Sequence, residues 1–143
     1  MDVYIKGMAD AQKDKGVSAF SIKNGKEEIA REFWQHHGHI RTKNLDFPIL
    51  EYGQKCQYLT ELWALNFAFT RITDQTRQAT VYTNSVVIAS WINSRECKED
   101  YTGLFNVFLD LSKNMMVKAV QVNLNSGGIL YSLRHEAMTL LNS

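Results

Sequence analysis

The first forty residues alternate between apolar and polar positions as the strands of an antiparallel meander do. Val3-Tyr4-Ile5 opens a strand, and residues 17 to 23 alternate at the two-residue period of a half-buried strand. Asn24-Gly25 is a pair typical of tight hairpin turns, and residues 27 to 37 continue as a third strand. This beginning favours a mixed sheet.

The period changes in the middle of the chain. Between Gly38 and Gly53 lies the only proline, Pro48, in a segment without a clear period, and we expect a loop there. From Gln54 to Ile72 the apolar positions recur at three and four residues, which predicts a long helix. The residues of its apolar face are Tyr58, Leu62, Leu65, Phe69 and Ile72.

The second half alternates strands and helices. The expected elements are a strand at 79–83, a helix begun by Asn84-Ser85 and ending at Trp91 or Asn93, a helix at 101–111, a strand at 116–122, a turn at 126–128 and a helix at 129–141. The order βββαβααβα predicts an α/β fold in which the later strands join by parallel, right-handed crossovers.

Composition limits the kind of protein. The 143 residues suit a single domain over 1–143, and 45% hydrophobic with 22% charged residues is ordinary for a globular chain. A net charge of +1 offers no broad field for a polyanion, so nucleic-acid binding would need a local patch. No stretch is long and apolar enough to span a membrane, and we expect a cytoplasmic protein without a membrane partner.

Four segments, in order, carry a family resemblance over nearly the whole chain. They are Tyr4-Ile5-Lys6-Gly7-Met8, Thr60-Glu61-Leu62-Trp63-Ala64-Leu65, Val81-Tyr82-Thr83-Asn84-Ser85, and the stretch from Val122 to Met138. They resemble the Asp-Gly-Ser turn, the helical Glu, the Thr-Asp-Ser strand end and the closing loop and helix of the ribonuclease H family. The resemblance implies a three-layer fold with a five-stranded mixed sheet and helices on both faces.

The resemblance also implies which residues would do chemistry. Members of the family cut the RNA strand of an RNA/DNA hybrid with two divalent ions held by four carboxylates. Here Lys6, Asn84 and His135 fall on three of those positions, and Glu61 alone keeps a carboxylate. The position of the family's flexible-loop histidine falls on Asn125.

These replacements favour a catalytically inactive ribonuclease H-like domain, for which no cofactor is expected. The alternative is an active metal-dependent ribonuclease H with rearranged carboxylate ligands, which would require Mg²⁺ or Mn²⁺. Acidic residues that could take part are Asp2, Asp10, Asp14 and Glu136. Such charges more often form a solvated rim.

The sequence allows two environments for the Lys6 side chain. It can extend its ammonium to water past apolar neighbours, or it can pair with Glu61 and occupy the place of a metal ion. Asn84 keeps a structural use in either case, because asparagine caps helices as well as aspartate does.

Partners are less well defined by the sequence. Lys13, Lys15, Lys23 and Lys26 cluster around the first hairpin, and the resemblance places Gln57 and Tyr58 where the family contacts a hybrid. These residues predict weak binding of an RNA/DNA hybrid or another nucleic acid. A protein partner is the other possibility, because reverse transcriptases contain degenerate domains of this fold as connectors.

Three neighbouring histidines and the two cysteines remain as candidates for metal or thiol chemistry. His36-His37-Gly38-His39 would place His37 and His39 on one face of a strand, but two ligands make no metal site, and a surface strand end is the plainer interpretation. Cys56 and Cys97 lack any CxxC spacing and are expected to be ordinary reduced thiols.

Overall fold

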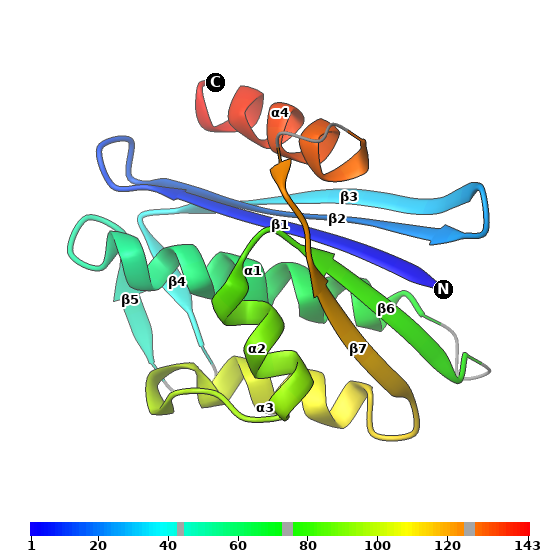
Figure 1. The fold of residues 1–143 in the computed structure, drawn as a ribbon. Coiled ribbons are helices and arrows are strands. Elements are labelled where there is room, and N and C mark those ends of the chain that lie inside the picture. The colour runs from blue at the N-terminus through cyan, green and yellow to red at the C-terminus, as the bar shows by residue number, and fades with distance from the viewer. Residues whose placement is uncertain (43–44, 73–75, 125–127) are drawn as a thin grey trace.

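The computed structural model describes residues 1–42, 45–72, 76–124 and 128–143 (Figure 1). Its strands are β1 (Asp2–Asp10), β2 (Lys15–Asn24), β3 (Glu27–His37), β4 (His39–Arg41), β5 (Asp46–Pro48), β6 (Gln78–Thr83) and β7 (Met116–Gln121). Its helices are α1 (Gly53–Thr70), α2 (Val86–Ser94), the 3-10 turn η1 (Glu99–Tyr101), α3 (Thr102–Leu111) and α4 (Ile129–Leu141).

Five strands form one mixed sheet in the order β3-β2-β1-β6-β7. β1, β2 and β3 make an antiparallel meander, and β1, β6 and β7 run parallel to one another. Gly25, with φ of +65°, occupies the turn between β2 and β3, a conformation that glycine adopts at little cost. The predicted meander and the predicted parallel crossovers are both confirmed.

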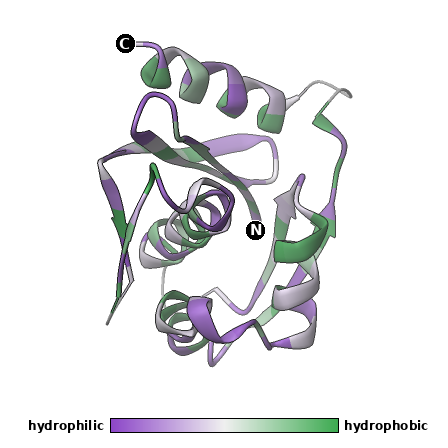
Figure 2. Cartoon of the chain, turned by 90° about the vertical axis from the view of Figure 1, so that its left-hand side faces the viewer, coloured by the Kyte–Doolittle hydropathy of each residue, from purple (hydrophilic) through white to green (hydrophobic). Residues whose placement is uncertain are grey.

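Helices cover both faces of the sheet, as Figure 2 shows in a view that separates the layers. α1, α2 and α3 share one core with the side chains of Val3, Ile5, Phe20 and Ile22. α4 packs on the other face, where Leu130, Leu133, Ala137 and Leu141 are buried against the meander. The predicted three-layer α/β fold is therefore present. No helix in the described part of the chain is long and apolar enough to cross a membrane.

The predicted loop between residues 38 and 53 is wrong in part. The segment contains β4 and β5, which pair antiparallel with Ile40 opposite Phe47. Ile40, Phe47 and Ile49 are buried in the core beside α1. Strands of three residues are too short to display a period, so the sequence pattern could not reveal them.

The helix predictions hold with small shifts at the ends. α1 ends at Thr70, so Ile72 lies beyond it, and Leu59, Ala64 and Ala68 are buried in addition to the predicted stripe. α2 begins at Val86 after an N-cap that is Ser85, whose Oγ accepts a hydrogen bond of 3.1 Å from the Ile88 N–H. The strand predicted to end at Val122 ends at Gln121.

Candidate functional site

The candidate site lies where two parallel strands separate. β1 and β6 pair only over Asp2–Tyr4 and Thr80–Tyr82, although β1 continues to Asp10. Beyond this short ladder the two strands no longer pair, and the space between them is called here the strand gap. Lys6 from β1, Glu61 from α1 and Asn84 after β6 meet in this gap, and we call these three residues the lysine cluster.

Lys6 joins the other two members of the lysine cluster. Its Nζ lies 3.6 Å from Glu61 Oε1 and donates a hydrogen bond of 3.1 Å to Asn84 Oδ1. Only 5% of Lys6 and 1% of Glu61 is exposed. The expected pairing with Glu61 is thus present, and the alternative of an ammonium in open water is wrong.

Gly7 allows α1 to approach β1 at this point. A Cβ on Gly7 would lie 2.4 Å from the Glu61 backbone nitrogen and 2.5 Å from the Thr60 carbonyl carbon. The backbone of Gly7 also favours the ionised form of the Glu61 carboxyl group. The glycine therefore sets how deeply Glu61 enters the gap between the strands.

Burial dominates the electrostatics of Glu61. Removal from water raises the pKa of its carboxyl group, while the Lys6 ammonium and the Gly7 N–H oppose that rise. One carboxylate oxygen, Oε2, is buried and has no hydrogen-bond partner. A buried acceptor left without a donor costs free energy, so the cluster is only partly satisfied by the chain itself.

Asn84 does not cap α2, contrary to the structural use that the sequence suggested for it. Ser85 is the N-cap, and Ser85 N–H itself donates to Thr83 Oγ1 over 3.0 Å. The Asn84 side chain is instead turned to Lys6. Its amide oxygen is committed to the ammonium rather than to the helix.

Of the other two residues of the family comparison, only His135 is among the described residues, and it does not join the cluster. His135 is exposed on α4. Since it is two residues from each of the buried Leu133 and Ala137, it lies on the side of the helix away from the sheet. Asn125 lies outside the described residues.

A pair of divalent ions does not fit these donors. Hard cations need several oxygen ligands, and the cluster offers one carboxylate and one amide oxygen that already accepts from Lys6. An ammonium stands between them and would repel a dication directly. In the described part of the chain, no three His, Cys, Asp or Glu side chains gather as a metal site would require.

Two of the four acidic residues of the alternative nuclease, Asp10 and Glu136, are used elsewhere. Asp10 Oδ1 accepts from the N–H groups of the β1–β2 turn, at Gln12 and Lys13. Glu136 pairs with Arg31 over 3.1 Å. Neither carboxylate has a contact with the lysine cluster.

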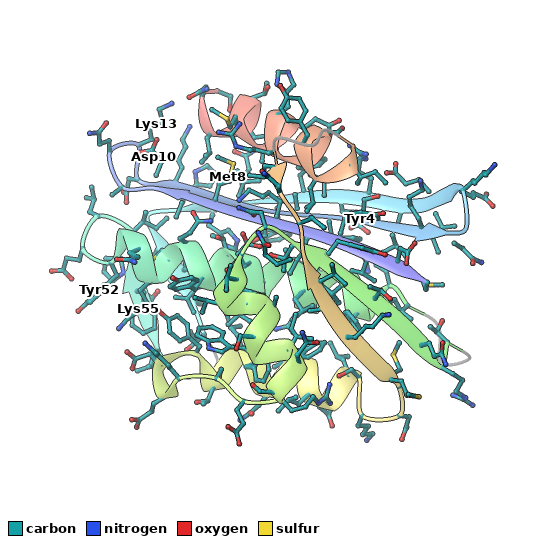
Figure 3. All side chains as sticks on the ribbon, in the orientation of Figure 1. Tyr4, Met8, Asp10, Lys13, Tyr52 and Lys55 are labelled. Atoms are coloured by element: carbon teal, nitrogen blue, oxygen red, sulfur yellow. The ribbon has the colours of Figure 1, made fainter. Side chains whose placement is uncertain are left out.

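The lysines predicted to bind a hybrid do not form one cluster. Lys13 and Lys15 lie at the β1–β2 turn, whereas Lys23 and Lys26 lie at the opposite end of β2 (Figure 1). Figure 3 shows Lys13 beside the end of α4. The Lys13 Nζ donates to Asn142 Oδ1, and the Lys15 Nζ donates to the Ser143 carbonyl over 2.6 Å.

Gln57 and Tyr58 are engaged in the fold. Gln57 donates to the Gly7 carbonyl over 2.5 Å and accepts from the Ala9 N–H over 3.0 Å. The ring of Tyr58 packs against Trp91 and Tyr101, with centroids 5.8 and 5.9 Å away. Both side chains are half-buried, so only their exposed parts are open to a hybrid.

Sequence reasoning missed a second polar cluster, made of His36, Ser18 and Thr60 and called here the histidine cluster. Ser18 Oγ donates to the Thr60 carbonyl over 2.7 Å and lies 2.9 Å from His36 Nε2. Because a hydroxyl has one hydrogen, His36 Nε2 must donate the second bond. Burial, with a smaller contribution from His37, lowers the pKa of His36 to about 4, so the ring is neutral at pH 7.

The histidine cluster corrects two sequence predictions. His36 is buried rather than part of a surface strand end. His37 ends β3 and His39 begins β4, and Gly38 between them has a φ of +78°, so the two histidines do not share one face of a strand. The two-residue period of β3 was the available signal, because it turns His36 toward the same side as Glu32 and Trp34.

The cysteines are free, as predicted. Cys56 is buried and Cys97 is half-buried, and burial raises the pKa of each thiol to about 11. Both are protonated at neutral pH and are poor nucleophiles.

Comparisons with known proteins identify the fold. No family model matches the chain, and no curated protein matches it. Among solved structures, it is similar to the N-terminal RNase H domain of Rv2228c from Mycobacterium tuberculosis, solved as a fusion with maltose-binding protein. The TM-score is 0.68 at 12% sequence identity, over 96% of this chain and 99% of that one. The chain therefore has a ribonuclease H-like fold.

Proposed function

We propose that this chain is a ribonuclease H-like domain that does not cleave nucleic acid and that serves in binding or in assembly. The observation that carries the proposal is the position of the Lys6 ammonium, in the strand gap between Glu61 and Asn84. Two-metal hydrolysis needs a cluster of carboxylates around two cations. An ammonium in that gap supplies a single fixed charge and no ligand.

The arrangement gives Lys6 a structural role within this proposal. Its side chain links β1, α1 and the end of β6, three elements that would otherwise meet around an unpaired buried carboxylate. A buried charge is tolerated when it is paired and hydrogen-bonded. The ammonium therefore holds the strand gap in place of an ion.

Recognition of an RNA/DNA hybrid is the weaker half of the proposal. Gln57 and Tyr58 are engaged in internal contacts, which leaves two predicted lysines at each end of β2, Lys13 with Lys15 and Lys23 with Lys26. Two lysines release few counterions, so binding would be weak and would fall with salt. Assembly with a protein partner is the role that the internal contacts favour.

A cleavage assay tests the proposal. The purified chain is incubated with a labelled RNA/DNA hybrid and Mg²⁺ or Mn²⁺, beside the Glu61→Ala variant. We expect no metal-dependent cleavage by either protein. Cleavage that is abolished by Glu61→Ala would establish the alternative, an active nuclease with rearranged ligands, and cleavage that the substitution leaves unchanged would indicate a contaminating nuclease.

A further inference from the structure

The two edge strands of the sheet are protected differently. At the β7 edge, the Asn93 side chain from α2 donates to the Ala119 carbonyl over 2.9 Å and accepts from the Ala119 N–H over 2.8 Å. This amide takes the place of a neighbouring strand. β3 is 11 residues long, and no described segment pairs with its outer side. An open edge of that length is a template for another strand.

The open edge carries exposed apolar side chains. Trp34 is 56% exposed and Ile29 is 48% exposed. The Trp34 ring lies 5.5 Å from the ring of Phe67, which in turn lies 5.3 Å from Trp63. The row of aromatic rings between β3 and α1 is thus open to solvent at its Trp34 end.

The arginines near this edge are paired within the chain. Arg31 pairs with Glu28 at 2.9 Å and with Glu136 at 3.1 Å. Glu32 accepts two hydrogen bonds from Arg71, at 2.6 and 2.9 Å. The edge therefore offers no excess positive charge to attract a polyanion, and an apolar, strand-forming partner suits it better.

We propose that β3 pairs antiparallel with β3 of a second copy of this chain, about a two-fold axis at Phe33, to form a continuous ten-stranded sheet. In such a dimer the axis is perpendicular to the sheet, and facing residues lie equally far from it along the two strands. The proposal concerns the sheet edge and does not depend on whether the domain cleaves nucleic acid.

The charge pattern selects this register. A two-fold axis at Arg31 would place the two Arg31 side chains opposite each other, and an axis at Glu32 would do the same for the two Glu32 side chains. An axis at Ala30 would place Glu28 of one copy opposite Glu32 of the other. Like charges directly opposite each other destabilise a strand pair. An axis at Trp34 avoids that repulsion, but because β3 ends at His37 it would pair only residues 31–37, whereas the axis at Phe33 pairs residues 29–37.

Both faces of the sheet are complementary in this register. On the α1 face, Trp34 of one copy lies opposite the partner's Glu32. The partner's Arg71 donates to that Glu32, which places the guanidinium beside the indole for a cation–π contact. On the α4 face, Phe33 packs against its own copy, and Arg31 lies opposite the partner's Gln35. The exposed Trp34 thereby becomes an interface residue with a defined neighbour.

Analytical ultracentrifugation over a wide concentration range tests the dimer. We expect the parent chain to dimerise. Trp34→Glu should weaken the dimer by roughly tenfold or more, since it removes a central aromatic residue and places a carboxylate opposite the partner's Glu32. Met116→Glu is the matched control, because Met116 is 73% exposed on the other edge strand. A parent that stays monomeric throughout, or a dimer that Trp34→Glu leaves intact, would overturn the proposal.

Cross-linking tests the register independently. In a Cys97→Ser background, Phe33→Cys brings two cysteines together at the axis, whereas two copies of Gln35→Cys would stand about 13 Å apart, four residues along the strands. We expect an oxidised dimer from Phe33→Cys alone. Should Phe33→Cys fail to fold, the double variant Arg31→Cys/Gln35→Cys places its cysteines opposite each other. Cross-linking of the Gln35→Cys single variant would contradict the register. Failure of both Phe33→Cys and Arg31→Cys/Gln35→Cys to cross-link would also contradict it.

Discussion

Adjacent residues of α1 enter two buried polar clusters of different character. The Thr60 carbonyl completes the histidine cluster, in which the Ser18 hydroxyl gives its hydrogen to Thr60 and the neutral His36 ring donates to Ser18. Glu61 enters the lysine cluster, where a carboxylate faces an ammonium and one of its oxygens has no partner. One cluster is neutral and the other is ionic, although both are buried beside β1 and β2.

The difference shows what each cluster requires. Neutral hydrogen-bonded groups can be buried at modest cost, so the histidine cluster is stable with the chain's own atoms. An ionised carboxylate is costly to bury without a positive charge beside it, and in the lysine cluster Lys6 provides that charge. Substitutions in α1's contacts with β1 and β3 should therefore have effects that depend on which cluster they disturb.

The largest loss of stability is expected at Gly7, where β1 contacts Thr60 and Glu61 of α1. Gly7→Ala places a methyl group 2.4 to 2.5 Å from the backbone atoms of Thr60 and Glu61, where no flexible side chain alone can relieve the overlap. We expect the free energy of unfolding to fall by more than about 4 kcal/mol, to the point of preventing folding. Urea denaturation followed by circular dichroism measures the change.

Gly25→Ala is the matched control for that substitution. A Cβ on Gly25 would meet nothing within 4 Å, and only its φ of +65° opposes an L side chain. The expected loss is about 1 kcal/mol. Equal losses at the two glycines would show that α1 does not press on β1 as described.

The next largest effect separates charge from packing in the lysine cluster. Lys6→Ala leaves the buried Glu61 carboxylate without its cation and should lower the free energy of unfolding by roughly 3 kcal/mol. Lys6→Ala combined with Glu61→Gln should recover much of that loss, because the group left behind is neutral. The double-mutant cycle measures the coupling between the two residues. If the single and the double variants have the same free energy of unfolding as the parent, the ion pair contributes nothing to stability.

The histidine cluster should respond to acid. The unfolded chain protonates His36 near pH 6.5, whereas the folded chain resists protonation until about pH 4. Stability from this group is present above pH 6.5 and is lost as the pH falls toward 4. Between pH 7 and pH 5 the loss amounts to about 2 kcal/mol.

His36→Phe isolates that effect. The raised pKa of Glu61 acts in the opposite direction, since a carboxyl group that favours its protonated form in the folded chain gains stability on acidification. The difference between the parent and His36→Phe in how the urea-derived free energy of unfolding changes with pH therefore reports His36 alone. His135→Phe, at an exposed position on α4, should match the parent. A pH slope that survives in His36→Phe would remove His36 as its source.

Long periodic segments predicted the fold, and short or strained ones did not. The alternation in β2 and β3 and the helical period of α1 follow from burial on one side of an element, which a sequence pattern records directly. β4 and β5 are three residues each and are held by Ile40 and Phe47 in the core, so tertiary packing determines them rather than any period.

For the candidate site, the sequence predicted which strand or helix carries each residue, but not how the side chains contact one another. The position of Lys6 on β1 and Glu61 on α1 implied that they could meet, and their mutual distance follows from the contact at Gly7, which no periodicity encodes. Gln57 was assigned to a ligand by resemblance, yet its amide bonds the backbone of β1, because a strand that leaves its neighbour exposes unpaired groups.

The most direct test of the central claim, that Lys6 holds the place of a divalent ion, is calorimetric titration with Mn²⁺. The parent chain should show no binding, whereas Lys6→Asp combined with Asn84→Asp should bind Mn²⁺, because three carboxylates would then surround the strand gap. Adding Glu61→Ala to that variant should abolish the binding. Binding of Mn²⁺ by the parent that disappears in Glu61→Ala would contradict the claim.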